Sequence, residues 1–172
     1  MPTTYTLISS NVLTSSAASV TFSSIPATYT DLVLRMSVRY DGSLVYGSTE
    51  IRFNSDSGAN YSRTTLYGDG SSAASSNASG GSALIFPRSI TGDTATANTF
   101  SNTEIYIPSY TVSQKKPISG FGVGENNSSS ASMAANAGLW QGTAAITTIF
   151  IQSNGTNLLS GSSFYLYGIS NT

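Results

Sequence analysis

Few side chains in this 172-residue chain could do chemistry. The chain contains no histidine and no cysteine, so it lacks the groups of Ser-His and Cys-His nucleophile systems and the usual zinc ligands. Only carboxylates remain as general acids or bases, and a glycosidase needs a pair of them. The carboxylates are Asp31, Asp41, Glu50, Asp56, Asp69, Asp93, Glu104 and Glu125.

Most of these carboxylates lie in turn sequences, where aspartate is favoured on conformational grounds alone. Glu50 and Glu104 lie at or near the starts of expected strands and could meet across a sheet. An ion pair with an arginine, or simple solvation, is the favoured interpretation of both. We therefore expect no enzyme activity, no catalytic residue and no cofactor.

The segment from Asn54 to Asn60, NSDSGAN, is rich in oxygen-bearing side chains, as calcium-binding loops are. It lacks the ligand spacing of an EF-hand and the terminal glutamate that binds calcium through both oxygens. The segment predicts a tight turn, and we expect no metal site.

Composition favours strands over helices. Charged residues make up only 9% of the chain, so the Glu, Lys and Arg that usually cover a helix are scarce. Ser, Thr, Tyr, Val and Ile suit strands. In the segment 31–40 every second residue from Leu32 to Tyr40 is apolar, which predicts a strand with one buried face.

Further strand candidates are separated by turns that contain Gly, Asn, Asp or Pro. Many short strands with such turns predict an all-β fold, either a sandwich or a closed barrel, with long Gly/Ser-rich loops. We expect one domain over residues 1–172, with residues 1–25 forming N-terminal strands or an arm. The other candidates are 4–9, 19–23, 50–54, 62–67, 83–86, 102–107, 118–123, 132–139, 145–152 and 163–169.

Two segments are ambiguous. Residues 68–82 are almost wholly Gly, Ser, Ala and Asn, which predicts a flexible surface loop. The alternative is an assembly loop that a neighbouring subunit orders. The Ala-rich residues 128–137 resemble a helix in composition, but their Gly and Ser flanks favour a strand.

Aromatic residues supply the candidate interface. Trp140, the only tryptophan, is most simply a core or rim anchor, and a sugar-stacking platform or a subunit contact is the alternative. In the segment 164–169, alternation places Tyr165 and Tyr167 on one face, where they form either cross-strand packing or an interface. The candidate interface residues are Trp140, Tyr165, Tyr167, Tyr106 and Tyr110.

Charge and hydropathy limit the partners. The formal net charge is -1, and only Lys115 and Lys116 are adjacent cations, so we expect no nucleic acid partner. No stretch approaches the roughly 20 apolar residues that span a bilayer, and the first residues lack the pattern of a secretory signal. These features predict a product made in the cytoplasm that later joins a larger assembly.

Six stretches of the sequence are distinctive when taken together: YGDG at 67–70, ATANTFSNTEIYIPSY at 95–110, ENN at 125–127, AGLW at 137–140, AAIT at 144–147 and FYLYGI at 164–169. Together they resemble small β-rich virion structural proteins of tailed bacteriophages of aquatic bacteria, including cyanophages. The resemblance covers nearly the whole chain and implies a structural protein of the particle with a β-sandwich of jelly-roll type.

This resemblance leads to a ranked set of functions. The first is a capsid decoration or cement protein, a homotrimer that binds the major capsid protein or other virion proteins and stabilises the head. The alternative is a tail-fibre or receptor-binding module that recognises host surface polysaccharide, and a glycan-cleaving enzyme ranks third. The expected location is the virion, at the capsid surface or in the tail, after synthesis in the host cytoplasm.

Overall fold

Twelve β-strands and no helix form the part of the chain that the computed structural model describes, residues 4–127, 129–154 and 156–170. The all-β prediction is therefore confirmed, and these residues contain no helix that could cross a membrane. The strands are β1 (Tyr5–Val12), β2 (Ser19–Phe22), β3 (Asp31–Ser37), β4 (Tyr46–Phe53), β5 (Tyr61–Gly68), β6 (Ala73–Gly81), β7 (Leu84–Thr91), β8 (Asn102–Ile107), β9 (Lys116–Glu125), β10 (Ala131–Trp140), β11 (Ile149–Ser153) and β12 (Ser163–Ile169).

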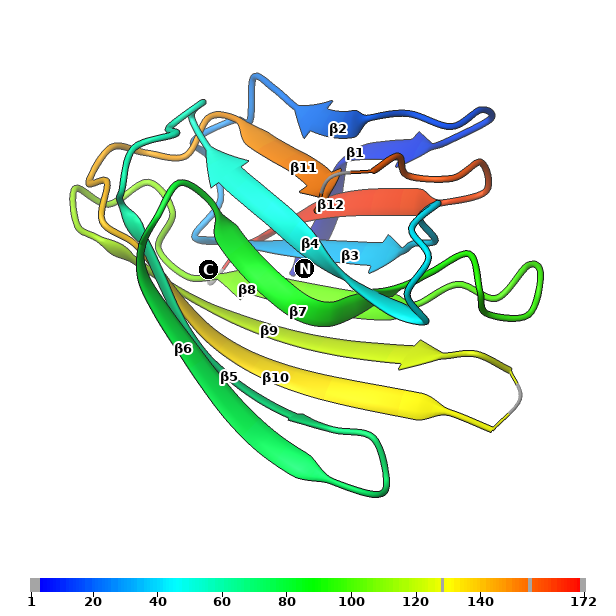
Figure 1. Cartoon of the computed structure of the whole chain (residues 1–172). Coiled ribbons are helices and arrows are strands. Elements are labelled where there is room, and N and C mark those ends of the chain that lie inside the picture. Colours follow the sequence, from blue (N-terminus) through cyan, green and yellow to red (C-terminus); the bar gives the residue numbers. More distant parts are fainter. Residues whose placement is uncertain (1–3, 128, 155, 171–172) are drawn as a thin grey trace.

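The strands form two antiparallel sheets that pack face to face. The large sheet has the order β1-β12-β3-β8-β9-β10-β5-β6, and the small sheet has the order β2-β11-β4-β7. In Figure 1, β4 and β7 of the small sheet lie in front of the large sheet. One cluster of buried apolar side chains fills the space between them, with Leu34 from the large sheet and Phe53 and Ile151 from the small sheet. The arrangement is a β-sandwich.

The strand order shows that eight of the strands form a jelly roll. Half of the large sheet reads β1-β12-β3-β8, and the small sheet reads β2-β11-β4-β7. The chain therefore passes between the two sheets in the double Greek-key order of a jelly roll, with the first and last strands paired. This agrees with the fold that the resemblance implies.

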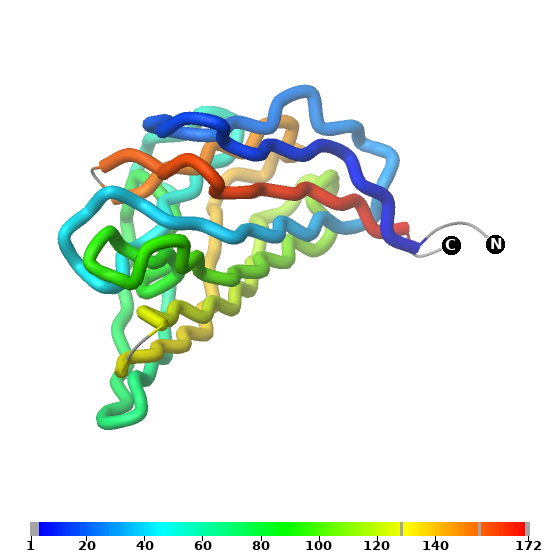
Figure 2. The backbone as a smooth tube through the Cα atoms, turned by 90° about the vertical axis from the view of Figure 1, so that its right-hand side faces the viewer, coloured from blue at the N-terminus to red at the C-terminus, as the bar shows by residue number. Residues whose placement is uncertain are grey.

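The other four strands continue the large sheet beyond β8, and we call β9, β10, β5 and β6 the sheet extension. They come from two insertions, the β5-β6 hairpin between β4 and β7 and the β9-β10 hairpin between β8 and β11. Figure 2 shows the extension reaching away from the two-sheet body toward the lower left. The extension thus adds a broad sheet surface to the jelly roll.

Strand β7 packs against the inner face of the extension. Glycines on this face allow the close approach. A Cβ on Gly120 would lie 2.4 Å from the ring of Phe86, and one on Gly138 would lie 2.7 Å from Leu84. Real Cβ atoms do not approach other atoms so closely, so larger residues at these positions would push β7 away.

The prediction of a flexible loop over residues 68–82 is wrong. Residues 69–72 form a turn, and 73–81 form strand β6, which pairs with β5. Backbone hydrogen bonds to one neighbouring strand order this segment, although none of its side chains is buried. Small polar side chains do not reveal such pairing, so composition pointed to a loop.

Two further predictions agree with the structure, and a third agrees in part. The Ala-rich segment is strand β10 from residue 131 on, and residue 128 lies outside the described residues. The described part of residues 1–25 forms strands β1 and β2. The predicted strand at 145–152 begins only at Ile149. Before it, the Ile146 amide donates to the carbonyl of Tyr110, and the amides of Thr147 and Thr148 donate to the side chain of Asn54.

Candidate functional site

The two strand glutamates do not meet. Glu104 on β8 accepts a hydrogen bond from Nε of Arg35 on β3 at 2.8 Å, and both side chains are about half exposed. Glu50 on β4 lies in the other sheet, where it accepts from Nε2 of Gln152 and lies 3.9 Å from Arg52. The interpretation of these glutamates as ion-pair partners is confirmed.

The segment 54–60 forms the predicted turn, and its carboxylate is bound by N–H donors. Asp56 accepts from Trp140 Nε1 at 2.7 Å, from the Gly58 amide at 2.9 Å and from Asn60 Nδ2 at 3.0 Å. The Trp140 hydrogen bond is the main reason why the pKa of Asp56 is lowered. Within the described residues, no group of three or more acidic side chains could hold a metal ion.

Two of the five candidate interface aromatics lie in the core. Trp140 is only 3% exposed and packs against Phe53, with 5.5 Å between ring centroids. This confirms the core-anchor interpretation and removes Trp140 from the candidate interface. Tyr110 is fully buried, and its hydroxyl donates to the carbonyl of Pro26. The prediction that Trp140 and Tyr110 are interface residues is wrong, because an inward ring with a hydrogen-bonded polar tip is well accommodated in a core.

The other three aromatics lie on the outer face of the large sheet. Tyr165 and Tyr167 are half-buried on the side of β12 opposite its core residues, as the alternation predicted. Val33 pairs with both Tyr106 and Tyr167, so the valine is buried although it faces outward. The Tyr106 hydroxyl donates to Asp31 at 2.7 Å, which raises the pKa of Tyr106 to about 12. Contact of these three tyrosines with another molecule stays a prediction.

A group of exposed apolar side chains occupies the outer face of the extension. We call Leu66, Phe121, Val123 and Met133 the outer patch, and they are 63%, 46%, 37% and 51% exposed. Val123 pairs with Met133, while Ala135 pairs with both Phe121 and Leu66. The patch therefore spans two adjoining cross-strand rows on β9, β10 and β5.

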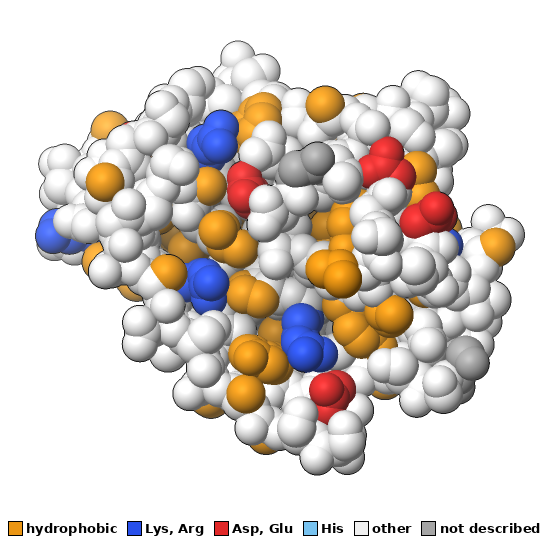
Figure 3. Space-filling view, viewed as in Figure 1, with side chains coloured by type: hydrophobic (Ala, Val, Ile, Leu, Met, Phe, Trp, Pro, Cys, Tyr) orange, Lys and Arg blue, Asp and Glu red, His pale blue; other side chains and the backbone are white. Residues whose placement is uncertain are grey.

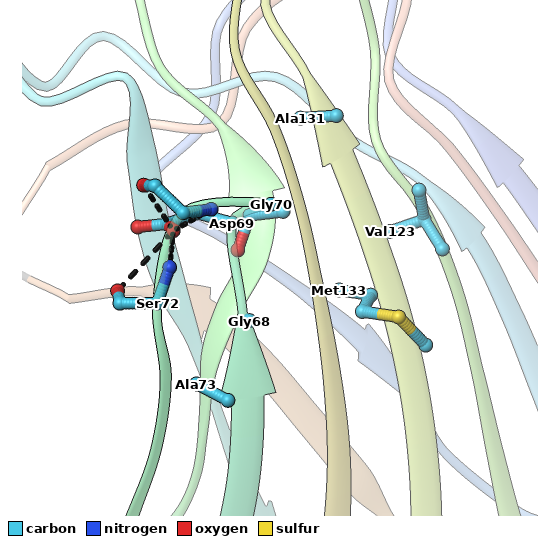
Figure 4. Close-up of a pocket in the computed structure, with 10 residues that line it drawn as sticks. Gly68, Asp69, Gly70, Ser72, Ala73, Val123, Ala131 and Met133 are labelled. Carbon is cyan, nitrogen blue, oxygen red and sulfur yellow. Dashed lines mark hydrogen bonds between the residues drawn. The ribbon is translucent and has the colours of Figure 1, made fainter.

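A hollow of about 640 Å³ adjoins the outer patch. It forms because Gly68 on β5 lies between Met133 on β10 and Ala73 on β6 and leaves the space between them unfilled. Figure 4 shows the Asp69 turn at one side of the hollow and Val123 on a strand at the other. The lining is mostly apolar, so the hollow suits an apolar side chain better than a charged group.

The turn beside the hollow is held by its own carboxylate. Asp69 Oδ1 accepts from the amides of Ser71 and Ser72 at 3.1 and 2.9 Å and from their hydroxyls at 2.9 and 3.2 Å. These hydrogen bonds, the Ser72 amide first, lower the pKa of Asp69 to about 2. The carboxylate is thus a structural part of the hairpin.

Charge is sparse around these surfaces. One ion pair, Arg35 with Glu104, separates the tyrosines from the outer patch. Figure 3 shows the opposite side of the molecule, that of the small sheet, where a few charged side chains are scattered among uncharged ones. The register places the outward residues of one row in this order across the sheet: Tyr165, Arg35, Glu104, Phe121, Ala135 and Leu66.

Reasoning from the sequence missed the outer patch, although one signal for it exists. In the segment 118–125, ISGFGVGE, glycines alternate with Phe121 and Val123. The alternation predicts a strand, but either set could face the core. The position of β7 against the glycines decides that the large side chains face outward.

Comparison with known proteins assigns the chain to no family. No protein-family model matches the sequence, and no curated protein matches it. The fold and the outer face of the large sheet are therefore the observations from which a function is proposed.

Proposed function

We propose that this chain is a structural protein of a bacteriophage particle that binds neighbouring virion subunits through its outer patch. The resemblance to phage virion proteins supports the particle. The outer patch supports the mode of action, and it is the single observation that carries the proposal. Contiguous exposed apolar side chains on a soluble domain usually mark a surface that another molecule covers.

The energetics fit a protein partner. Full burial of one such side chain contributes about 1.5–3 kcal/mol, and part of this gain is lost to the cost of association. The Arg35–Glu104 ion pair lies beside the patch instead of within it, so covering the patch need not desolvate this pair. Apolar side chains of the partner would enter the hollow next to Met133.

More specifically, we propose that the chain is a capsid decoration protein. Copies of the chain would cover the major capsid protein lattice and stabilise the head after synthesis in the host cytoplasm. A jelly roll with an enlarged sheet suits this role because it offers a broad, nearly uncharged face for lateral contacts.

The test is the copy number of the chain in purified particles, followed by a binding assay. We expect a stoichiometry comparable to that of the capsid protein. Purified Leu66→Ser should bind particles that lack the chain at least about tenfold more weakly than the parent protein, because a central apolar contact is lost. Leu44→Ser is the matched control, since Leu44 is 66% exposed and lies outside the patch. Absence of the chain from particles, or equal binding of both variants, would overturn the proposal.

One observation favours a second candidate, a tail module that binds host polysaccharide. Tyr165 lies next to the Arg35–Glu104 ion pair on the outer face. Aromatic rings beside planar charged groups are suited to sugar stacking and hydrogen bonding. In this case the chain should be scarce in particles, and Tyr165→Ala should abolish binding on a glycan array. Trp140→Ala is no test of this candidate, because Trp140 is buried.

A further inference from the structure

Strand β6 is an unprotected sheet edge. Proteins usually block edge strands by making them short, or with a proline, a bulge or a charge. The other three edges have such features: β2 has four residues, β7 contains Pro87, and the register of β1 shifts between Leu7 and Ser9. Strand β6 has nine residues, none of them charged or proline, and its register shifts only beyond Ala78.

The register shows which backbone groups of β6 are free. The amide of Asp69 donates to the carbonyl of Ser72, so the 69–72 pair is hydrogen-bonded. Hydrogen-bonded pairs alternate along an antiparallel ladder, so Ala74 and Ser76 direct their backbone groups toward β5. The N–H and C=O groups of Ala73, Ser75 and Asn77 therefore point away from β5, toward the open edge of the sheet. Among the described residues no other strand pairs with this edge.

We propose that β6 pairs antiparallel with β6 of a second copy of this chain, on a two-fold axis at Ser75. With this axis, Ser75 faces Ser75 of the second copy, and Ala73 faces Asn77. About six backbone hydrogen bonds then form, all within the regular part of the strand. An axis at Asn77 would instead use residues beyond the register shift and would form fewer regular bonds.

The side chains of β6 permit this contact. They are all Ala, Ser, Asn or Gly, so no like charges oppose each other across the axis and no bulky groups collide. The outward row that contains Phe121, Ala135 and Leu66 ends at Ser75. In the dimer this row continues into the same row of the second copy, so the two outer patches join into one surface centred on the axis.

Single cysteines test the register, because the chain contains none of its own. In the dimer, Ser75→Cys places two Cα atoms about 5.5 Å apart, within the range of a disulfide. Ala73→Cys places its two copies roughly 14 Å apart, beyond that range. Under mild oxidation we expect Ser75→Cys to form covalent dimers at least about tenfold faster than Ala73→Cys. Equal rates, faster crosslinking of Ala73→Cys, or no crosslinking of either variant would overturn the proposal.

A proline variant tests the hydrogen bonds. The Ser75 amide is not needed by β5, so Ser75→Pro should leave the fold intact, which circular dichroism can verify, and should shift sedimentation to the monomer. Ser75→Thr keeps the amide and should remain dimeric. A dimer that persists in folded Ser75→Pro contradicts the inference.

The dimer does not depend on the proposed virion role. A two-fold contact also differs from the expected homotrimer. A trimer mass for the parent protein would therefore overturn the proposed dimer. Monomeric Ser75→Pro that still binds particles would leave the proposed function intact, whereas a dimer that binds no particle would refute only that function.

Discussion

The jelly roll and the sheet extension use the same strand pattern in opposite ways. On β3 the residues that face the small sheet are large and apolar, such as Leu34, and Arg35 faces water. On β9 three successive inward residues, Gly120, Gly122 and Gly124, are glycines, and Phe121 is exposed. The first region has room for large side chains between two sheets, whereas the second has β7 directly against its backbone.

This difference separates residues that stabilise the fold from residues that are free to bind. Burial of Leu34 contributes to the free energy of folding through its removal from water. Phe121 remains half exposed, so much of its apolar surface is still available for burial against a partner. Four substitutions in the two regions test this separation.

The largest effect is expected in the jelly-roll core. Leu34→Ala should lower the free energy of unfolding by about 2–5 kcal/mol, because it creates a cavity between two packed sheets. Urea denaturation measures this change. A loss below about 1 kcal/mol would mean that the core relaxes around the cavity, contrary to tight packing.

A smaller loss is expected at the inner face of the extension. Gly120→Ala should destabilise by about 1–3 kcal/mol, because its Cβ would lie 2.4 Å from the Phe86 ring. The neighbouring Ser119→Ala, on the exposed face, is the control and should be nearly neutral. If both variants behave alike in denaturation, β7 does not pack closely on β9.

A local, pH-dependent effect is expected at the β5-β6 turn. The pKa of Asp69 is lowered to about 2, so the ionised carboxylate stabilises the turn above pH 4, and this contribution is lost as the pH falls through about 2. Amide exchange of Ser71 and Ser72 should therefore speed up over this range, relative to the exchange of core amides. Asp69→Asn should remove the transition, and an unchanged transition in that variant would assign it to another group.

The smallest effect on stability is expected in the outer patch. Leu66→Ser should change the free energy of unfolding by no more than about 0.5 kcal/mol, because Leu66 is 63% exposed in the isolated chain. Thermal unfolding of Leu66→Ser beside Leu44→Ser measures it. A large destabilisation would show that Leu66 stabilises the fold and would weaken its assignment to binding.

Local patterns predicted much of the fold. Period-two alternation located most strands, including the opposite faces of Phe164 and Tyr165 on β12. The turn at 54–60 also followed from residue types, and pairing with an arginine was one of the two interpretations of Glu104 that they favoured. Strand β6 was missed because its order comes from pairing with β5, and small polar side chains carry no signal for that pairing.

The amino-acid sequence was sufficient for the all-β class, because alternation and turn residues act over neighbouring positions in the chain. The outward direction of Phe121, the burial of Tyr110 and the free edge of β6 were not accessible in this way. Each depends on which distant strand lies against a given face or edge. That choice follows from the packing of two sheets with two inserted hairpins, which is a property of the whole molecule.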